Sequence, residues 1–455
     1  MSEAGSAGPA PVAGRSTDDF QRTGVDQAPL VDHPPVTDWE TDFDHTVAEW
    51  AQNAQEIWAE FRQGCPVAHT ERFGGCWFPS LYADVSEIAH DTENFSSRNI
   101  VVNDIGPFGQ APVGFAPPIT SDPPFHKIAR KLLLGPFAPK AVAALEPATR
   151  ELCRSLIREM LAGAGPDGVV DAATDYAQHI PVRVIARMLG LPETDGERFR
   201  AFIHRILEKP GQVAVAPGET LSAYLQEVIQ ERIAEPRDDL ISYLAHADID
   251  GEPLTPDHVF GSIALLLIAG IDTTWSAIGA SLWHLAQNPD HYARLRTEPE
   301  VWPFAVEEFL RFYAPVTMAR VVQQPVEVGG AAMAPDDWVL LAFPSANRDE
   351  AAFDDAGEFV IDRQRNRHAA FGLGIHRCVG SNLARMELRV ALQEWTAAVG
   401  AFELADYDPA SVRWSTGQVR GPRELPVHII EATAPESAAN SDTEADTEST
   451  RPEGQ

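Results

Sequence analysis

The chain has 455 residues, of which 44% are hydrophobic, and a formal net charge of −32. This length and apolar content are ample for a large buried core. The strongly negative charge excludes a general affinity for nucleic acids or anionic membranes.

The two ends of the chain differ in composition from the middle. Residues 1–35 are rich in Ala, Gly, Pro and Ser, and residues 431–455 carry seven acids against one arginine. Neither segment can bury enough apolar surface to fold, so we expect both to be disordered. The length between them would allow two or three domains. The motifs described below follow one another without a long linker, and we therefore expect one domain over 36–430.

Cysteine usage and hydropathy indicate the compartment. Cys65, Cys76, Cys153 and Cys378 form no C-x-x-C pair, and nothing resembles a secretion signal or an N-terminal membrane anchor. The longest apolar stretch is too short and too interrupted to span a bilayer of about 30 Å. We expect a cytoplasmic protein.

The periodicity of apolar residues predicts a mainly α fold. Helical spacing is found over 141–162, 172–189, 219–234 and 256–287. Short extended segments are predicted over 75–80 and 324–341.

Three further sequence patterns, each taken alone, indicate no particular function. His126 and Arg130 would lie one helical turn apart, as two surface charges often do. The apolar run 259–271 predicts a buried central helix, in which a polar patch, Asp272-Thr273-Thr274, could bend the axis. Glu308 and Arg311 would share a helix face, which on a surface is worth only a few tenths of a kcal/mol.

The loop before residue 381 is more informative. Glycines precede Cys378, and residues 381–395 are rich in helix formers. Cys378 would therefore sit at a helix N-terminus, which favours a thiolate. A lone cysteine is usually a small buried hydrophobe. Placed on such a loop, it can offer its sulfur to haem iron.

Phe371, Gly374, Cys378 and Gly380 resemble the haem-binding signature of the cytochromes P-450, the haem-thiolate monooxygenases. Val379 stands where that family usually has leucine. The resemblance implies Cys378 as the iron ligand and haem b, iron protoporphyrin IX, as the cofactor. It also implies a single large helical domain with small β-sheets, and haem between a central distal helix and the cysteine loop.

The same resemblance gives the other motifs a role. Glu308 and Arg311 would be buried with Arg363 as a structural network around the haem pocket. Asp272 and Thr273 would handle oxygen and protons. Four basic residues would neutralise the haem carboxylates: His126, Arg130, Arg320 and His376.

Substrate contacts follow from alignment with the family's pocket. The residues implied are Leu265, Ile268, Ala269, Val316, Thr317 and Met318. The segment 99–118, with Phe108 and Phe115, would form a lid over the substrate. Residues 194–235 would cover the pocket from above, but their sequence gives little indication of which side chains face the substrate. The apolar walls favour a small hydrophobic substrate, such as a terpenoid or a simple aromatic, over a carboxylate-bearing one.

The implied activity is insertion of one oxygen atom from O2. No dinucleotide-binding motif or fused reductase is recognisable, so a separate ferredoxin-type donor and an NAD(P)H reductase would supply the electrons. Basic residues expected near the cysteine face would dock the donor: Lys127, Arg130, Lys131, Arg367 and Arg377.

Three alternatives compete with this interpretation. A haem-thiolate peroxygenase or dehydratase would share the cysteine loop but commonly lacks the acid and alcohol that Asp272 and Thr273 provide. A haem sensor would bind the cofactor without turnover. A haem-free helical protein would make the order of all the motifs a coincidence.

Overall fold

The protein is described by a computed structural model over residues 33–104, 106–107, 114–207, 220–406 and 408–432. The expected mainly α fold is confirmed. The described helices are α2 (Trp39–Asp42), α3 (Ala48–Gln52), α4 (Ala54–Gly64), α5 (Tyr82–His90), α6 (Phe125–Leu134), α7 (Pro139–Ala143), α8 (Glu146–Gly163), α9 (His179–Leu189), α10 (Gly196–Leu207), α11 (Leu221–Ala234), α12 (Leu240–Ala245), α13 (Pro256–Gln287), α14 (Pro289–Thr297), α15 (Trp302–Phe312), α16 (Phe343–Ala346) and α17 (Ser381–Ala398).

The terminal segments expected to be disordered lie outside the described residues, except for 33–35 and 431–432. Residues 431 and 432 end the last strand, β12, so the folded part extends slightly beyond the expected boundary at 430.

Two of the expected helices are interrupted. The stretch 141–162 is divided between α7 and α8, and Pro147 lies in the first turn of α8, where its missing N–H costs nothing. The stretch 172–189 begins as a π-helix over Ala172–Ala177 before α9. The central helix α13 has the expected bounds, and α11 begins at Leu221, after its N-cap Thr220.

The described strands form small sheets, as expected. The largest has the order β1-β2-β10-β7-β3, and another has the order β11-β12-β4. The extended segment 75–80 contains β2, and 324–341 contains the β8–β9 hairpin and β10. The strands are β1 (Val67–Thr70), β2 (Cys76–Pro79), β3 (Phe95–Ser96), β4 (Val169–Asp171), β5 (Asp248–Ile249), β6 (Glu252–Pro253), β7 (Met318–Val322), β8 (Val326–Val328), β9 (Ala331–Met333), β10 (Trp338–Leu341), β11 (Val399–Leu404) and β12 (Pro426–Ala432).

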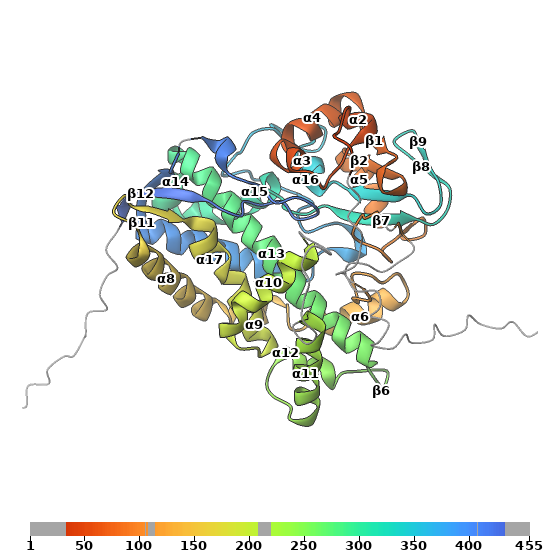
Figure 1. Cartoon of the computed structure of the whole chain (residues 1–455), viewed down its shortest axis with the longest axis horizontal. Helices are drawn as coiled ribbons and strands as arrows, with labels where there is room; N and C mark the ends of the chain where they lie inside the picture. Colours follow the sequence, from red (N-terminus) through yellow and green to blue (C-terminus); the bar gives the residue numbers. More distant parts are fainter. Residues whose placement is uncertain (1–32, 105, 108–113, 208–219, 407, 433–455) are drawn as a thin grey trace, which may run out of the picture.

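Helix α13 crosses the middle of the molecule, with β1, β2 and β7 on one side and α8 and α9 on the other (Figure 1). It is apolar on most sides and buried along most of its length, as a core helix should be. The expectation that this stretch is too short and too interrupted to span a bilayer is wrong, because α13 is long and apolar enough to do so. However, 72% of its apolar window is buried inside the protein.

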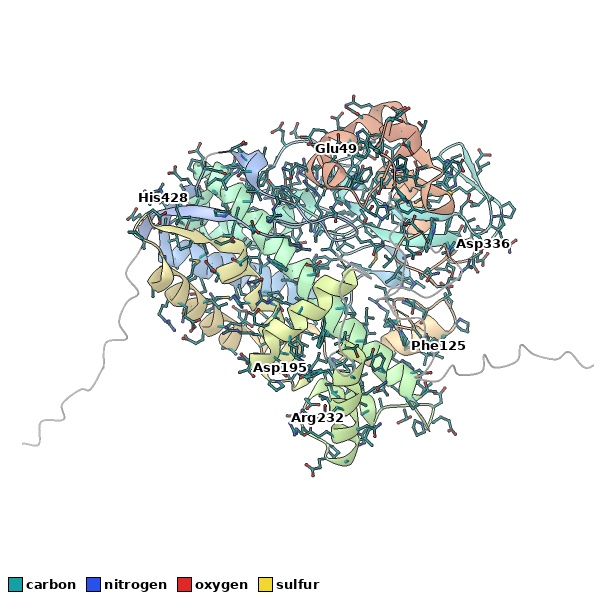
Figure 2. The ribbon with its side chains drawn as sticks, in the orientation of Figure 1. Glu49, Phe125, Asp195, Arg232, Asp336 and His428 are labelled. Carbon is teal, nitrogen blue, oxygen red and sulfur yellow. The ribbon has the colours of Figure 1, made fainter. Side chains whose placement is uncertain are left out.

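Two close approaches bring other segments against the helices around α13. A Cβ at Gly261 would lie 2.0 Å from the carbonyl oxygen of Phe115, so glycine lets the segment before α6 rest on α13. Arg232 on α11, labelled in Figure 2, donates to Asp239 at 2.7 Å and to the Gly190 carbonyl at 2.8 Å. These bonds tie α11 to the end of α9.

Candidate functional site

Cys378 lies on a loop that ends at the N-terminus of α17. Gly372 and Gly374 have φ of 69° and 65°, which side chains with a Cβ rarely adopt. A Cβ at Gly374 would also lie 2.2 Å from the carbonyl oxygen of Ala89. The Cys378 N–H donates to the Phe371 carbonyl at 2.7 Å, which closes the loop. These constraints fix where the thiol stands.

The thiol lies in the wall of a cavity of about 260 Å³ between α13 and the cysteine loop. Apolar side chains make most of the wall. The cavity contacts every residue expected at the substrate: Leu265, Ile268, Ala269, Val316, Thr317 and Met318. Asp272, Thr273, Phe371 and Gly380 also line it, whereas Gly374 does not.

The segment expected to be a lid contributes differently from the expectation. Phe108 lies outside the described residues. The Phe115 ring instead packs 6.1 Å from the ring of Phe125, measured between centroids, and is absent from the cavity wall. The cavity contacts of this segment are Ile100, Val101, Pro118 and Ile119.

Four basic residues gather at one edge of the cavity. The rings of His126 and His376 are 4.3 Å apart, and His376 Nε2 lies 2.9 Å from the Ser97 hydroxyl. Arg320 is 5% exposed and donates to the adjacent Ala319 carbonyl at 2.8 Å. Arg130 donates to the carbonyl of Arg377, next to Cys378. The expected basic group is therefore assembled in space.

Within the described part of the chain, this group has little negative charge to match its arginines. Burial, together with Arg320, His126 and Arg130, lowers the pKa of His376 to about 2. Burial lowers the pKa of Arg320 to about 10, opposed only by Asp122. That carboxylate already accepts from Ser96 and Ser97.

The arrangement fits a haem. Among the described residues, His126 Nε2 is buried without a hydrogen-bond partner, next to a cavity edge that carries Arg130 and Arg320. Two carboxylates entering there would pair with the arginines and accept hydrogen bonds from the histidines, as haem carboxylates do. The macrocycle would then lie in the apolar cavity, against the Cys378 thiol.

The protein around Cys378 does not by itself favour a thiolate. Burial raises the pKa of its thiol, while the Gly380 N–H and the nearby arginines, Arg130, Arg377 and Arg385, lower it by less. A coordinated metal ion would supply the missing charge, because a thiol bound to a metal is deprotonated outright.

Asp272 and Thr273 lie on the face of α13 that borders the cavity. The Thr273 hydroxyl donates to the Ala269 carbonyl one turn back, at 3.0 Å. Asp272 is 2% exposed and pairs with Arg423, whose Nη1 and Nη2 lie 2.8 and 3.0 Å from its two oxygens. The Arg423 guanidinium also stacks 4.4 Å from the Trp275 ring centroid.

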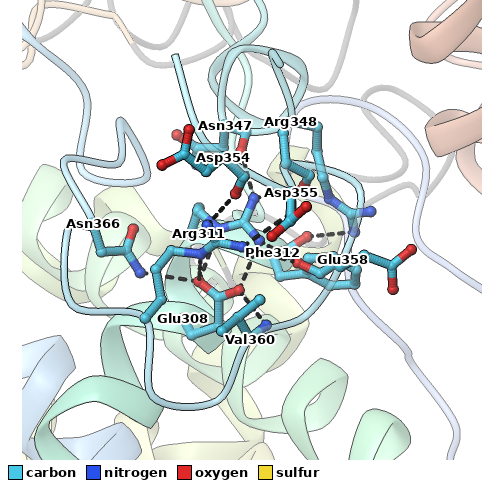
Figure 3. A network of polar contacts seen from close by, with 12 residues as sticks. Glu308, Arg311, Phe312, Asn347, Arg348, Asp354, Asp355, Glu358, Val360 and Asn366 are labelled. Carbon is cyan, nitrogen blue, oxygen red and sulfur yellow. Dashed lines mark hydrogen bonds and ion pairs between the residues drawn. The ribbon is translucent and has the colours of Figure 1, made fainter. Parts of the chain in front are cut away.

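Glu308, Arg311 and Arg363 form the expected buried network. Glu308 accepts two bonds from Arg311, at 2.7 and 2.8 Å, and one from Arg363 at 3.0 Å (Figure 3). It also accepts from the N–H of Val360 and the amide of Asn366. Glu308 and Arg311 are fully buried, so removing one partner should cost roughly 3–5 kcal/mol.

Arg311 extends the network to the loop that follows α16. Its guanidinium donates to the carbonyls of Asn347, Ala356 and Glu358 at 2.7–2.8 Å. This loop leads to the cysteine loop, so the network fixes the approach to Cys378.

Sequence reasoning missed several residues at the site. Arg423 and Gln418 come from the segment before β12, and Ser97 follows β3. The Gln418 amide donates to the Ile100 carbonyl at 2.6 Å, which joins two cavity walls. No motif marks these residues, because their partners lie far away in the sequence.

Comparison with known proteins agrees with this geometry. Residues 197–396 match the family model described as Cytochrome P450. Nocardicin C N-oxygenase of Nocardia uniformis subsp. tsuyamanensis is 34% identical over 362 residues, which cover 77% of this chain and 89% of the relative. The chain belongs to the cytochrome P450 family.

Solved P450 structures share the fold. CYP109Q5 from Chondromyces apiculatus has a TM-score of 0.74 at 33% identity, covering 86% of this chain and 98% of that one. CYP109E1 from Bacillus megaterium, solved in complex with testosterone, has a TM-score of 0.74 at 29% identity, covering 85% and 100%. This P450 is therefore a haem b monooxygenase of the type found in bacteria.

Proposed function

We propose that this P450 inserts one oxygen atom from O2 into a small hydrophobic substrate, such as a terpenoid or a simple aromatic. The observation that carries the proposal is the cavity between α13 and the cysteine loop. It has a thiol on one wall, a basic group at one edge and apolar side chains elsewhere. Bound haem would supply the oxygen chemistry, and the protein would orient the substrate and control protons.

Cys378 would be the axial ligand, on a loop shaped by Phe371, Gly374 and Gly380. Four basic residues would hold the haem carboxylates: His126, Arg130, Arg320 and His376. In support, they lie together, and the pKa of Arg320 is raised only by Asp122, which is already hydrogen-bonded to Ser96 and Ser97. Glu308, Arg311 and Arg363 would keep the surrounding loops in place.

Asp272 and Thr273 would manage protons on the opposite wall. Thr273 has a hydroxyl bonded to its own helix that could exchange this bond for one to a ligand. Asp272 is buried and held by Arg423, whose side chain is 14% exposed. The pair thus connects the cavity wall with the outside of the protein, along a route that a proton could follow.

A separate ferredoxin-type donor, served by an NAD(P)H reductase, would supply electrons at the cysteine face. Lys127 and Lys131 are exposed on α6, and Arg377 is exposed beside Cys378. The bond from Arg130 to the Arg377 carbonyl brings α6 next to the cysteine loop. Exposed Ile128, Leu134 and Ile375 lie on the same two segments. A mixed basic and apolar surface suits an acidic donor.

The cavity walls support an apolar substrate. Leu265, Ile268 and Ala269 line it from α13, and Val316 and Met318 line it from the segment after α15. Burying an apolar ligand against such walls is favourable at roughly 25 cal/mol per Å². The charged side chains of the wall belong to the expected haem and proton groups, which leaves no described cation for a substrate carboxylate. We place the enzyme in the cytoplasm, where its four unpaired cysteines would stay reduced.

A spectral screen tests the proposal. Terpenoids, simple aromatics and their carboxylated analogues are titrated into the haem-loaded protein, and water displacement from the iron is read from the absorption spectrum. We expect the neutral compounds to bind and to yield products carrying one added oxygen atom from 18O2. Leu265→Trp should fill the cavity and abolish the shift, whereas Ile430→Trp, at an exposed position, should not. Preferential binding of the carboxylates would contradict the substrate class.

A further inference from the structure

A second ion pair lies directly behind the cysteine loop. Arg385 on α17 donates from Nε to Oε1 of Glu307 at 2.5 Å and from Nη2 to Oε2 at 2.8 Å. His368 Nε2 lies 3.0 Å from the same Oε2. Glu307 precedes Glu308 on α15 but takes no part in the buried network around Glu308. None of the roles proposed above uses this pair.

The guanidinium of Arg385 faces the cysteine loop. It lies 4.4 Å from the centroid of the Phe371 ring, and its Nη1 donates to the Ser381 carbonyl at 3.4 Å. The carbonyl of Phe371 accepts the N–H of Cys378 at 2.7 Å. Arg385 therefore touches the residue that closes the loop around the thiol, and Glu307 holds Arg385 there.

Both members of the pair are charged at neutral pH. Burial opposes the ionisation of Glu307, but the bonds from His368 and Arg385 prevail and lower its pKa to about 2. Arginine stays protonated in proteins. Arg385 therefore places a fixed positive charge close enough to lower the pKa of the Cys378 thiol, and Glu307 places a negative charge against Arg385.

We propose that the Glu307–Arg385 pair sets the reduction potential of the iron held by Cys378, with Arg385 raising it and Glu307 moderating the increase. This inference rests on the proposed function, since it requires haem at Cys378. Reduction adds one electron, and hence one negative charge, to the iron and its sulfur ligand. A nearby cation stabilises that charge and a nearby anion opposes it. Arg385 is a positioning and tuning residue, because it acts through Phe371 and not on the substrate.

The two charges make opposite predictions. In Arg385→Gln the cation is lost and Glu307 remains, so the potential should fall. In Glu307→Gln the cation remains without its counter-charge, so the potential should rise. Each change should alter the ratio of ferrous to ferric protein at a fixed potential roughly tenfold, which is about 59 mV for one electron. The double variant should return close to wild type.

The experiment is a spectroelectrochemical titration of the haem-loaded protein without substrate, using dithionite as reductant and dye mediators. Arg385→Lys keeps the charge and should retain most of the potential. Arg389→Gln is the matched control, because Arg389 lies one turn further along α17 and pairs with Glu146 at 2.6 Å. It should leave the potential unchanged.

A pair with a purely structural role predicts a different result. Both single variants would then unfold at a lower temperature but keep the wild-type reduction potential, and that outcome would overturn the proposal. Shifts of the same sign would overturn it too. Loss of the thiolate-type carbon monoxide spectrum from the wild type would instead remove the proposed function itself, so the two failures are distinguishable.

Discussion

The Nη1 atom of Arg423 lies 2.8 Å from Oδ1 of Asp272, and its Nη2 lies 3.0 Å from Oδ2. The arginine comes from the segment before the last strand and the acid from the middle of α13. This contact gives the buried acid a charged partner that reaches toward the surface.

Arg423→Gln should destabilise the fold and slow proton delivery together. Removing one partner of a buried pair costs roughly 3–5 kcal/mol, because the other charge is left uncompensated. Chemical denaturation measures the stability, and product formed per electron consumed measures proton delivery. Arg413→Gln is the control, since Arg413 pairs with Glu424 in the same segment but is 75% exposed. Equal stability and coupling in the two variants would show that Arg423 is dispensable.

Thr273→Ala should still bind substrate and consume reducing equivalents, but should divert much of the flux to hydrogen peroxide. The reason is that the hydroxyl beside the cavity would no longer be available to direct protons. Asp272→Asn should slow turnover instead. Peroxide and product are measured in the same reaction. An unchanged yield per electron in both variants would mean that these residues only shape the helix.

Glu387 gives the protein a pH-dependent stability. It is 1% exposed on α17, its Oε2 has no hydrogen-bond partner among the described residues, and burial raises its pKa to about 8. The folded protein therefore holds this proton more tightly than the unfolded chain, whose value is near 4.5. Stability from this group is fully present below about pH 4.5 and is lost as the pH rises to about 8.

Each pKa unit corresponds to about 1.4 kcal/mol, so the full loss is of the order of 5 kcal/mol. Glu387→Gln should remove this dependence and raise the unfolding temperature above pH 8 relative to wild type. Glu151→Gln, at an exposed carboxyl on α8, should not. Parallel pH profiles for wild type and Glu387→Gln would contradict a protonated Glu387.

Donor docking at the cysteine face predicts a salt-dependent defect. Lys131→Glu and Arg377→Glu should weaken reduction by a ferredoxin-type donor at low salt, with the loss shrinking as salt rises. Exposed charges are screened over about 10 Å at 0.1 M. Substrate binding should be unchanged in both variants. The control variant Arg158→Glu, on α8, should be reduced by the donor at the wild-type rate. Wild-type reduction rates at low salt would place docking elsewhere.

The sequence predicts those parts of this site that are formed by residues close together in the chain. The cysteine loop, the polar step in α13 and the Glu308–Arg311 pair are each local patterns. The first two line one cavity, and the pair is hydrogen-bonded within α15, outside the cavity wall. The order of these patterns along the chain is typical of the P450 fold.

Contacts between distant residues carry no such signal. Asp272 and Arg423 are 151 residues apart, and Glu307 and Arg385 are 78 apart. In the sequence, each of these four residues looks like an ordinary surface or core charge. Only the fold brings the two partners of each pair together. Similarly, the Phe115 ring packs beside Phe125 and not in the cavity, because Gly261 lets its backbone rest on α13. Local composition cannot distinguish these two positions.

The most direct test of the whole account is the absorption spectrum of the reduced, carbon monoxide-bound protein. If Cys378 is the axial ligand, the wild type should show the red-shifted band of thiolate ligation and Cys378→His should lose it, although haem is still bound. Cys153→Ser, at a buried cysteine away from the cavity, should keep the band. Retention of the band in Cys378→His would contradict the assignment of Cys378, and with it the proposed chemistry.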